Sequence, residues 1–148
     1  MNQEHLEKLI LTGYKLIALE TDSPEQTIND FRPMVRQSKA IYQWENNTGL
    51  SRMEASHINI PNTKTPEMVL SHIKQSKLYG IYLLVGFNNE LIKPGIQSTL
   101  LQIADDASSN KVIIFIDNYF NYPHKLMSKL LITQEPEVRA RTSFEQTA

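Results

Sequence analysis

The chain has 148 residues, the length of one ordinary domain, and its 41% hydrophobic and 21% charged residues exclude an intrinsically disordered protein. Fifteen basic residues against sixteen acidic ones give a formal net charge of −1, which is not the basic excess typical of nucleic-acid-binding proteins. There are no cysteines, so disulfide frameworks, thiolate zinc sites and cysteine nucleophiles are excluded as well.

The first part of the chain is predicted to form a helix, a strand and a second helix. Residues 3–12 have apolar side chains at helical spacing, and residues 14–21 contain the apolar run of a buried strand. Ser23, Pro24 and Gln26 then have the order of an N-cap serine, a first-turn proline and a capping-box glutamine. We therefore expect a helix that begins at this point.

The middle of the chain is predicted to contain a strand followed by a long polar excursion. Pro33 should kink or shorten the preceding helix, and residues 40–45 (AIYQWE) then favour a strand. Residues 46–64 are too long for a simple turn, so we expect a short hairpin or an ordered excursion there. Thr65 and Pro66 indicate the start of the next helix.

The last part of the chain alternates strands and helices before it becomes polar. The predicted elements are a strand over 80–87, a helix from Pro94 or Gly95, a strand over 111–117, a short helix over 123–129 and a strand over 130–133. This alternation predicts a three-layer α/β fold with a mostly parallel sheet of about four to five strands and helices on both faces. We expect one such domain over residues 1–134 and a polar C-terminal tail over 135–148.

No complete nucleotide-binding motif is present. None of the five glycines precedes Lys-Ser or Lys-Thr, as a P-loop requires, and no G-x-G-x-x-G occurs. The turn after the first strand carries Glu20 and Asp22, two carboxylates that would repel phosphate. Asp117 ends a strand that resembles a Walker B strand, but an aspartate in that place is more often a turn-former.

Metal or hydrolytic chemistry has one candidate set of residues. Glu20, Asp22 and Asp117 are expected near the carboxyl edge of the sheet, where open α/β folds bind ligands. A metal-dependent nucleotide or nucleic-acid phosphohydrolase that uses this acidic cluster is the alternative function. The four histidines are far apart in sequence and have no metal-binding spacing, so we expect neither a metal site nor a cofactor.

Aromatic residues mark two further places. Tyr42 and Trp44 alternate along one strand and share a face, for which core packing is the more frequent explanation. Tyr119, Phe120 and Tyr122 follow the strand that ends at Asp117, and exposed loop aromatics are unusual unless something covers them. This trio therefore indicates an interface or a ligand contact.

The remaining classes of partner are less well supported. Lys64, Lys74 and Lys77 form the densest basic group, and we interpret them as solvated charges, so nucleic acid is an unlikely partner. No apolar run approaches the roughly 18 residues that span a bilayer, and the first residues lack the order of a signal peptide. We expect a cytoplasmic protein with no membrane contact.

Several segments together resemble the N-terminal region of a bacterial and plastid family of AAA-type ATPases. The resembling segments are residues 16–21 (LIALET), 42–44 (YQW), 48–50 (TGL), 65–67 (TPE), 80–87 and 111–117. The resemblance covers about residues 6–132 and implies a degenerate, RecA-like or P-loop-like domain without a P-loop that precedes the ATPase module. The chain ends where that module would begin, so the Walker motifs of the family are expected to lie outside this sequence.

The resemblance implies a non-catalytic, regulatory or protein-binding domain whose partner is another protein or a second copy of itself. The residues expected to contact that partner or a ligand are Glu20, Asp22, Trp44, Asp117, Tyr119 and Tyr122.

Overall fold

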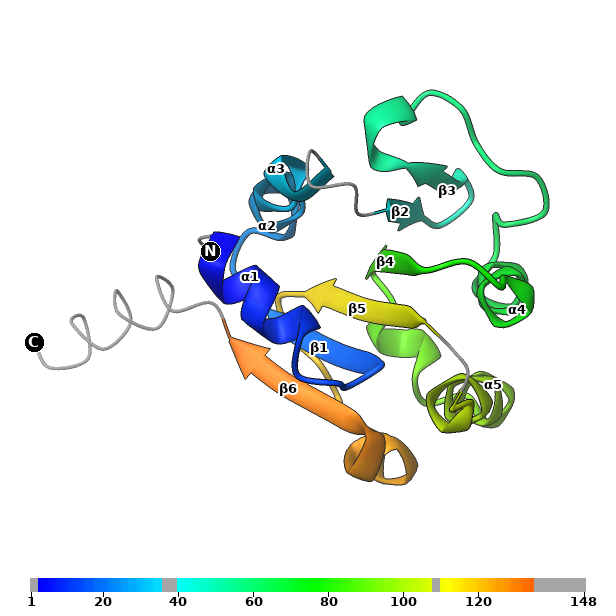
Figure 1. Ribbon diagram of the computed structural model, residues 1–148. Helices are drawn as coiled ribbons and strands as arrows, with labels where there is room; N and C mark the ends of the chain where they lie inside the picture. The colour runs from blue at the N-terminus through cyan, green and yellow to red at the C-terminus, as the bar shows by residue number, and fades with distance from the viewer. Residues whose placement is uncertain (1–2, 36–39, 108–109, 135–148) are drawn as a thin grey trace, which may run out of the picture.

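The computed structural model describes residues 3–35, 40–107 and 110–134, which form a three-layer α/β domain (Figure 1). The strands are β1 (Leu16–Glu20), β2 (Ile41–Glu45), β3 (Gly49–Arg52), β4 (Gly80–Val85), β5 (Lys111–Asp117) and β6 (Leu130–Gln134). The helices are α1 (Gln3–Ile10), α2 (Pro24–Asp30), α3 (Arg32–Val35), α4 (Pro66–Gln75) and α5 (Pro94–Asp105), with 3-10 helices η1 (Met53–Ala55), η2 (Asn88–Glu90) and η3 (His124–Lys129).

The six strands form one mostly parallel sheet in the order β3-β2-β4-β5-β1-β6. Strand β3 pairs antiparallel with β2, whereas the other neighbouring strands pair in parallel. The predicted fold class is therefore confirmed, with six strands in place of the expected four or five. The additional strand is β3, which lies in the predicted excursion.

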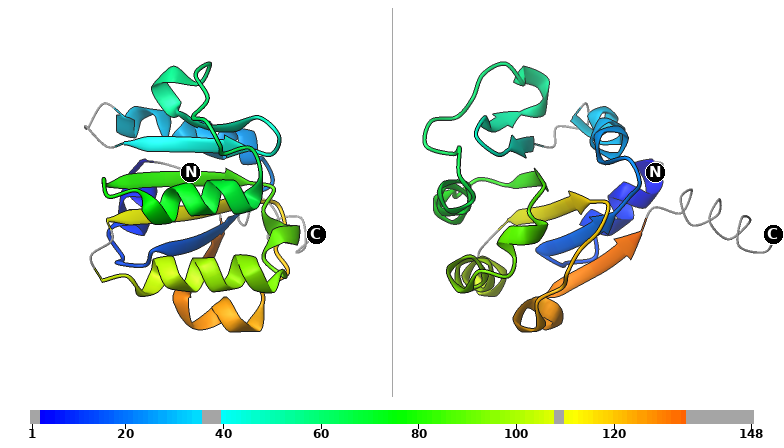
Figure 2. Two further views of the ribbon diagram at one scale, coloured as in Figure 1. Left: turned by 90° about the vertical axis from the view of Figure 1, so that its right-hand side faces the viewer. Right: turned by 180° about the vertical axis from the view of Figure 1, so that it is seen from behind.

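Helices cover both faces of the sheet, as Figure 2 shows from the side and from behind. Helices α1, α2 and α3 lie on one face, and α4, α5 and η3 lie on the other. Because the parallel strands are covered on both sides, β1, β4 and β5 are almost entirely buried. The near-continuous apolar runs of these strands follow from this burial on both faces.

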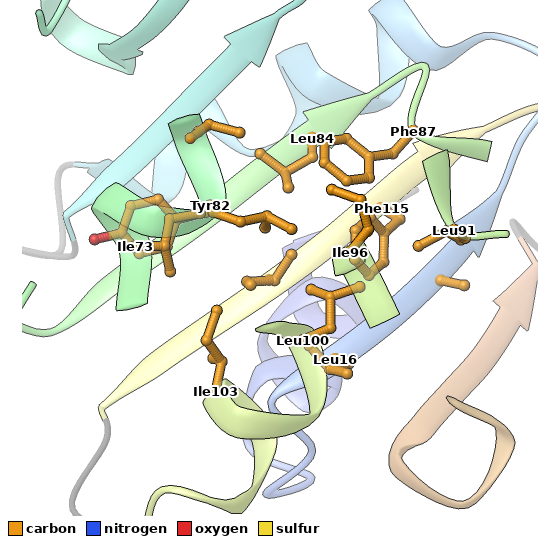
Figure 3. Packing of buried hydrophobic residues seen from close by; sticks show 14 of the residues in the cluster. Leu16, Ile73, Tyr82, Leu84, Phe87, Leu91, Ile96, Leu100, Ile103 and Phe115 are labelled. Carbon is orange, nitrogen blue, oxygen red and sulfur yellow. The ribbon is translucent and has the colours of Figure 1, made fainter. Parts of the chain in front are cut away.

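The larger core lies between the sheet and helices α4 and α5 (Figure 3). Ile73 of α4 and Leu100 of α5 point toward Tyr82 and Phe115 on the strands, and all four side chains are at most 1% exposed. Phe87 lies 5.5 Å from Phe115 between ring centroids and joins the same cluster. The helical spacing of apolar residues in α4 and α5 therefore had the predicted role of facing the sheet.

The two proline-initiated helix starts differ in their capping. The Oγ1 of Thr65 accepts a hydrogen bond from the backbone N–H of Met68 at 3.2 Å, which caps α4. The side chain of Ser23 makes no such bond at the start of α2, so the predicted capping box is wrong there. Helix α2 ends at Asp30, and Pro33 lies in the separate short helix α3, as its fixed φ predicts.

The polar excursion is an ordered hairpin whose outer edge is closed by its own chain. The backbone of Leu50 in β3 donates to the Thr63 Oγ1 at 2.9 Å and accepts from the Ile60 N–H at 2.7 Å. The Thr63 hydroxyl in turn donates to the Ile60 carbonyl at 2.7 Å. Residues 60–63 therefore satisfy the backbone N–H and C=O of Leu50.

Two further predictions concern the ends of the domain and the membrane. Among the described residues no helix is long and apolar enough to cross a bilayer. The predicted tail over residues 135–148 lies outside the described residues.

Candidate functional site at the carboxyl edge of the sheet

The carboxyl ends of β1 and β5 meet at a topological switch point. The two strands are neighbours in register, so Glu20 lies opposite Asp117. The chain leaves β1 toward α2 on one face of the sheet and leaves β5 toward η3 on the other. Open α/β sheets bind their ligands in the crevice at such a point, which makes this edge the candidate site.

Glu20 is held by side chains from two different segments. Its Oε2 accepts a hydrogen bond from the Tyr122 hydroxyl at 2.9 Å, and its Oε1 accepts one from the Gln134 Nε2 at 2.8 Å. Burial raises the pKa of Tyr122 well above its usual value, and the neighbouring Glu20 carboxylate raises it further. Tyr122 therefore stays protonated and acts as a hydrogen-bond donor at neutral pH.

The turn after β1 is shaped by threonine hydroxyls. The backbone N–H of Thr21 donates to the Asp117 carbonyl at 3.0 Å, which extends the pairing of β1 and β5 by one residue. The Thr21 Oγ1 accepts from the Ser23 N–H at 3.2 Å and from the Thr27 hydroxyl at 2.9 Å. In this position a P-loop would present backbone N–H groups to a phosphate. Here one of those N–H groups, that of Ser23, is already bonded to the turn itself.

The three loop aromatics have different environments. Phe120 is buried and stacks on Tyr122, with ring centroids 5.7 Å apart, so both contribute to packing. The loop is further tied to η2, because the Asn121 N–H donates to the Asn88 Oδ1 at 2.7 Å. Tyr119 remains 59% exposed. It is therefore the member of the trio that presents a large ring to solvent.

Trp44 lies in the core. Its side chain is 3% exposed and packs edge-on against Phe87, with ring centroids 5.3 Å apart. Its Nε1–H donates to the Thr63 carbonyl at 2.7 Å. The indole therefore anchors the excursion to the sheet, and the core-packing interpretation of the Tyr42–Trp44 pair applies to it.

The acidic residues at the edge do not form a metal-binding group. Glu20 and Asp117 are adjacent, as expected, but among the described residues no three histidine, aspartate or glutamate side chains gather where they would hold a metal ion. Asp22 is exposed on the turn after β1. Both carboxylate oxygens of Glu20 already accept hydrogen bonds within the protein.

A cavity of about 270 Å³ lies beside the candidate site, and the sequence did not reveal it. Its polar lining comes from α2, β2, β3 and the excursion, and includes Glu25, Gln43, Glu45 and Ser51. Gln43 and Ser51 are opposite one another in the hairpin and share a face of the sheet. The signal in the sequence was Gln43, a polar residue between the buried Ile41 and Trp44 of β2, and its place in a cavity followed only from the pairing of β2 with β3.

The three lysines considered for nucleic-acid binding are not brought together. Lys64 lies two residues before α4, and Lys74 lies in the last turn of that helix. Because a helix rises about 1.5 Å per residue, Lys64 and Lys74 are about 15 Å apart along the axis of α4. Lys74 and Lys77 are instead close to the opposite, amino edge of the sheet, where both line one cavity.

Comparison with known proteins identifies the family of the chain. The family model of the SpoVK-like AAA ATPase N-terminal domain matches residues 2–134. The chain belongs to this family. The matched range of the SpoVK-like N-terminal domain includes every helix and strand described above, so the resemblance inferred from the sequence is confirmed. No curated protein and no solved structure matches the chain.

Proposed function

We propose that this SpoVK-like N-terminal domain is a non-catalytic protein-binding domain, and that its contact surface is the carboxyl edge around Tyr119. The observation that carries the proposal is the state of Glu20 at the switch point. Both of its carboxylate oxygens accept hydrogen bonds, from Tyr122 and from Gln134. A carboxylate engaged in this way fixes the loop after β5 and the last strand, which is a structural role.

The exposed ring of Tyr119 supports a contact with another protein. Tyrosine is enriched in protein interfaces because its ring supplies apolar area while its hydroxyl stays hydrated. Tyr119 is two residues from Asp117, and the loop that follows it is fixed by the hydrogen bond of Tyr122 to Glu20 and by that of Asn121 to Asn88. A partner would therefore meet a positioned aromatic side chain, which lowers the entropy lost on binding.

The non-catalytic part is tested by ligand binding and turnover. Purified protein is heated with ATP or GTP, each with and without Mg²⁺ or Mn²⁺. A ligand at about 100 times its dissociation constant would stabilise the fold by about 2.7 kcal/mol, or about 5–11 °C for a domain of this size. We expect no shift and no phosphate release. A reproducible shift or turnover would overturn the non-catalytic assignment.

The contact surface is tested by site-specific photo-crosslinking. A photoreactive phenylalanine analogue replaces Tyr119 in one variant and Ile58 in a control variant, since these side chains are 59% and 60% exposed. We expect a crosslink to one defined protein, or to a second copy, from position 119 alone. Equal labelling from the two positions would contradict the proposed surface.

The alternative, a metal-dependent phosphohydrolase, keeps one favourable observation. Glu20 and Asp117 are adjacent on neighbouring strands, and paired carboxylates are a common beginning of a Mg²⁺ or Mn²⁺ site. If this alternative holds, Mn²⁺ stabilises the wild type, and Asp117→Ala abolishes that stabilisation. Under our proposal, Mn²⁺ changes neither the melting temperature of the wild type nor that of Asp117→Ala.

A further inference from the structure

The amino edge of the sheet, opposite the candidate site, carries a basic surface that the proposed function does not use. Described residues that follow α1, α4 and α5 and precede β1, β4 and β5 line two cavities there. We call this region the amino-edge surface. Its residues are Leu11, Tyr14, Lys15, Lys74, Lys77, Leu78, Tyr79, Asp106, Asn110 and Lys111.

Two adjoining cavities occupy the amino-edge surface. One has a volume of about 530 Å³ and is lined by residues from the end of α4 and the α5–β5 loop, including Lys74 and Lys77. The other has a volume of about 370 Å³ and is lined by Leu11, Tyr14 and Tyr79 among others. Both cavities share Asn110 and Lys111, so they are neighbours at the amino ends of the strands, and we refer to the two together as the depression.

The charge of this depression is strongly positive. The lining of the two cavities includes four lysines and one carboxylate, that of Asp106. Lys111 is 5% exposed and donates from its Nζ to the Lys74 carbonyl at 2.9 Å, so a cation is fixed at the base. The Lys15 Nζ donates to the Asp106 backbone carbonyl at the rim. By contrast, the cavity at the carboxyl edge is lined by two glutamates and by no lysine or arginine.

Exposed apolar side chains lie in the same segments as these lysines. Leu11 lines the second cavity, and Leu78 lies between Lys77 and Tyr79 in sequence, each of which lines one of the cavities. Leu11 is 80% exposed and Leu78 is 74% exposed, and they are the two most exposed large hydrophobic residues described. Tyr14 and Tyr79 add two rings that are 41% and 40% exposed. Large apolar side chains that gather in one place on a surface mark an interaction site more often than scattered ones do.

We propose that the amino-edge surface binds an acidic peptide segment of a partner protein, with the carboxylates of the segment near the lysines and an aliphatic side chain against Leu11 and Leu78. Charge complementarity selects an anionic partner, because lysines outnumber carboxylates in the lining. The exposed leucines select a peptide over a nucleic acid, because phosphates and sugars would leave that apolar area uncovered. This surface is distinct from the one around Tyr119, so the inference goes beyond the proposed function.

The inference is tested with three fluorescent probes of defined chemistry. The first is a peptide in which glutamates surround a pair of leucines, and the second has alanines in place of those leucines. The third is an oligothymidylate of equal negative charge. Fluorescence anisotropy with the wild-type protein should show binding of the first probe and binding weaker by about tenfold or more for each of the others. Raising the ionic strength from about 0.1 to about 1 M shortens the Debye length from about 10 to about 3 Å, so it should weaken the binding of the first probe.

Two pairs of matched variants separate the surface from general effects of charge and hydrophobicity. Lys74 and Lys77 are both exposed, so K74E/K77E should fold. It should bind the leucine peptide about tenfold more weakly than the wild type does. K64E/K125E changes the net charge equally at two exposed positions elsewhere and should alter binding by less than about twofold. Leu78→Ser should weaken the peptide, whereas Ile58→Ser, at a residue that is 60% exposed, should not. The fluorescence of Trp44 in each variant verifies that the core is intact.

Each of the following results would overturn the inference. Equal binding of the oligothymidylate would identify a nucleic-acid surface, and equal effects of K74E/K77E and K64E/K125E would remove the assigned site. If sedimentation shows that the wild type is an oligomer and K74E/K77E is a monomer, a second copy of the chain would be identified as the occupant. Crosslinking from position 119 is measured in the wild type alongside peptide binding. A crosslink from position 119 without binding of the leucine peptide would refute the amino-edge inference alone, and peptide binding without that crosslink would refute the proposed function alone.

Discussion

Replacing Thr63 with valine should destabilise the domain without creating a cavity. Valine has nearly the same shape as threonine, but it lacks the hydroxyl that accepts from the Leu50 N–H and donates to the Ile60 carbonyl. Thr63 is fully buried, so water cannot replace the lost partner. An unsatisfied buried donor costs about 1–3 kcal/mol and the second hydrogen bond contributes about 1 kcal/mol, which gives about 2–4 kcal/mol in total.

The single tryptophan makes this prediction simple to measure. Trp44 donates its Nε1–H to the Thr63 carbonyl, so its fluorescence reports on the segment that is perturbed. Urea denaturation followed by this fluorescence gives the free energy of unfolding, and about 2–4 kcal/mol corresponds to a fall of about 4–16 °C in Tm. Thr99→Val is the control, because the Thr99 hydroxyl donates only to the Gly95 carbonyl one helical turn earlier. If Thr63→Val and Thr99→Val lose the same small amount of stability, the hydroxyl does not support β3 and the reasoning is refuted.

Three further predictions concern capping, packing and pH. Thr65→Ala should lower the free energy of unfolding by about 1 kcal/mol because it removes the cap of α4, whereas Ser23→Ala should change it little; urea denaturation measures both. In the same assay, Gly80→Ala should cost about 1–3 kcal/mol because its Cβ would meet the Tyr82 ring at 2.9 Å, whereas Gly95→Ala meets nothing within 4 Å and should be neutral or stabilising. The raised pKa of Tyr122 favours its protonated form in the native state, so the stability that this group contributes is present below about pH 10 and is lost as the pH rises further. The difference in stability between the wild type and Tyr122→Phe should therefore shrink between about pH 9 and pH 12.

Each of these predictions has an outcome that would contradict it. Equal losses for Thr65→Ala and Ser23→Ala would mean that the side-chain bond to Met68 contributes nothing to α4. A neutral Gly80→Ala would mean that the Tyr82 ring moves away from the added methyl group without loss of packing. A difference between wild type and Tyr122→Phe that is constant with pH would show that the phenol has the same pKa in the folded and unfolded chain.

The elements of the fold were readable because local sequence and tertiary burial agree in most of the chain. Strands β4 and β5 are covered on both faces, so each consists of a continuous apolar run. Prolines at the first turn mark α2, α4 and α5 because a missing N–H costs nothing there. Ser23 shows the limit of such signals, since the Thr21 hydroxyl accepts the hydrogen bond from the Ser23 N–H and the serine side chain does not cap the helix.

The details of the candidate site were less accessible, because they depend on contacts between distant residues. Tyr122 and Gln134 bond to Glu20 across 102 and 114 residues, and no local pattern encodes that convergence. The meeting of Glu20 and Asp117 was predictable, since both end parallel strands at the same edge. The burial of Trp44 was not decided by its spacing alone, because alternation gives the shared face but not which side is covered.

Residues 60–63, which bond to the backbone of Leu50 in β3, affect how readily the domain aggregates. An outermost strand normally offers a free template on which a foreign or misfolded chain can add its own strand and begin aggregation. In this domain the backbone of Leu50 is already occupied by Ile60 and Thr63 from the same chain. At Leu50 the sheet thus gives an incoming strand no free backbone partner, so growth from this position into larger assemblies is blocked by the protein's own sequence. We therefore expect substitutions at residues 60–63 to increase the tendency of the protein to aggregate.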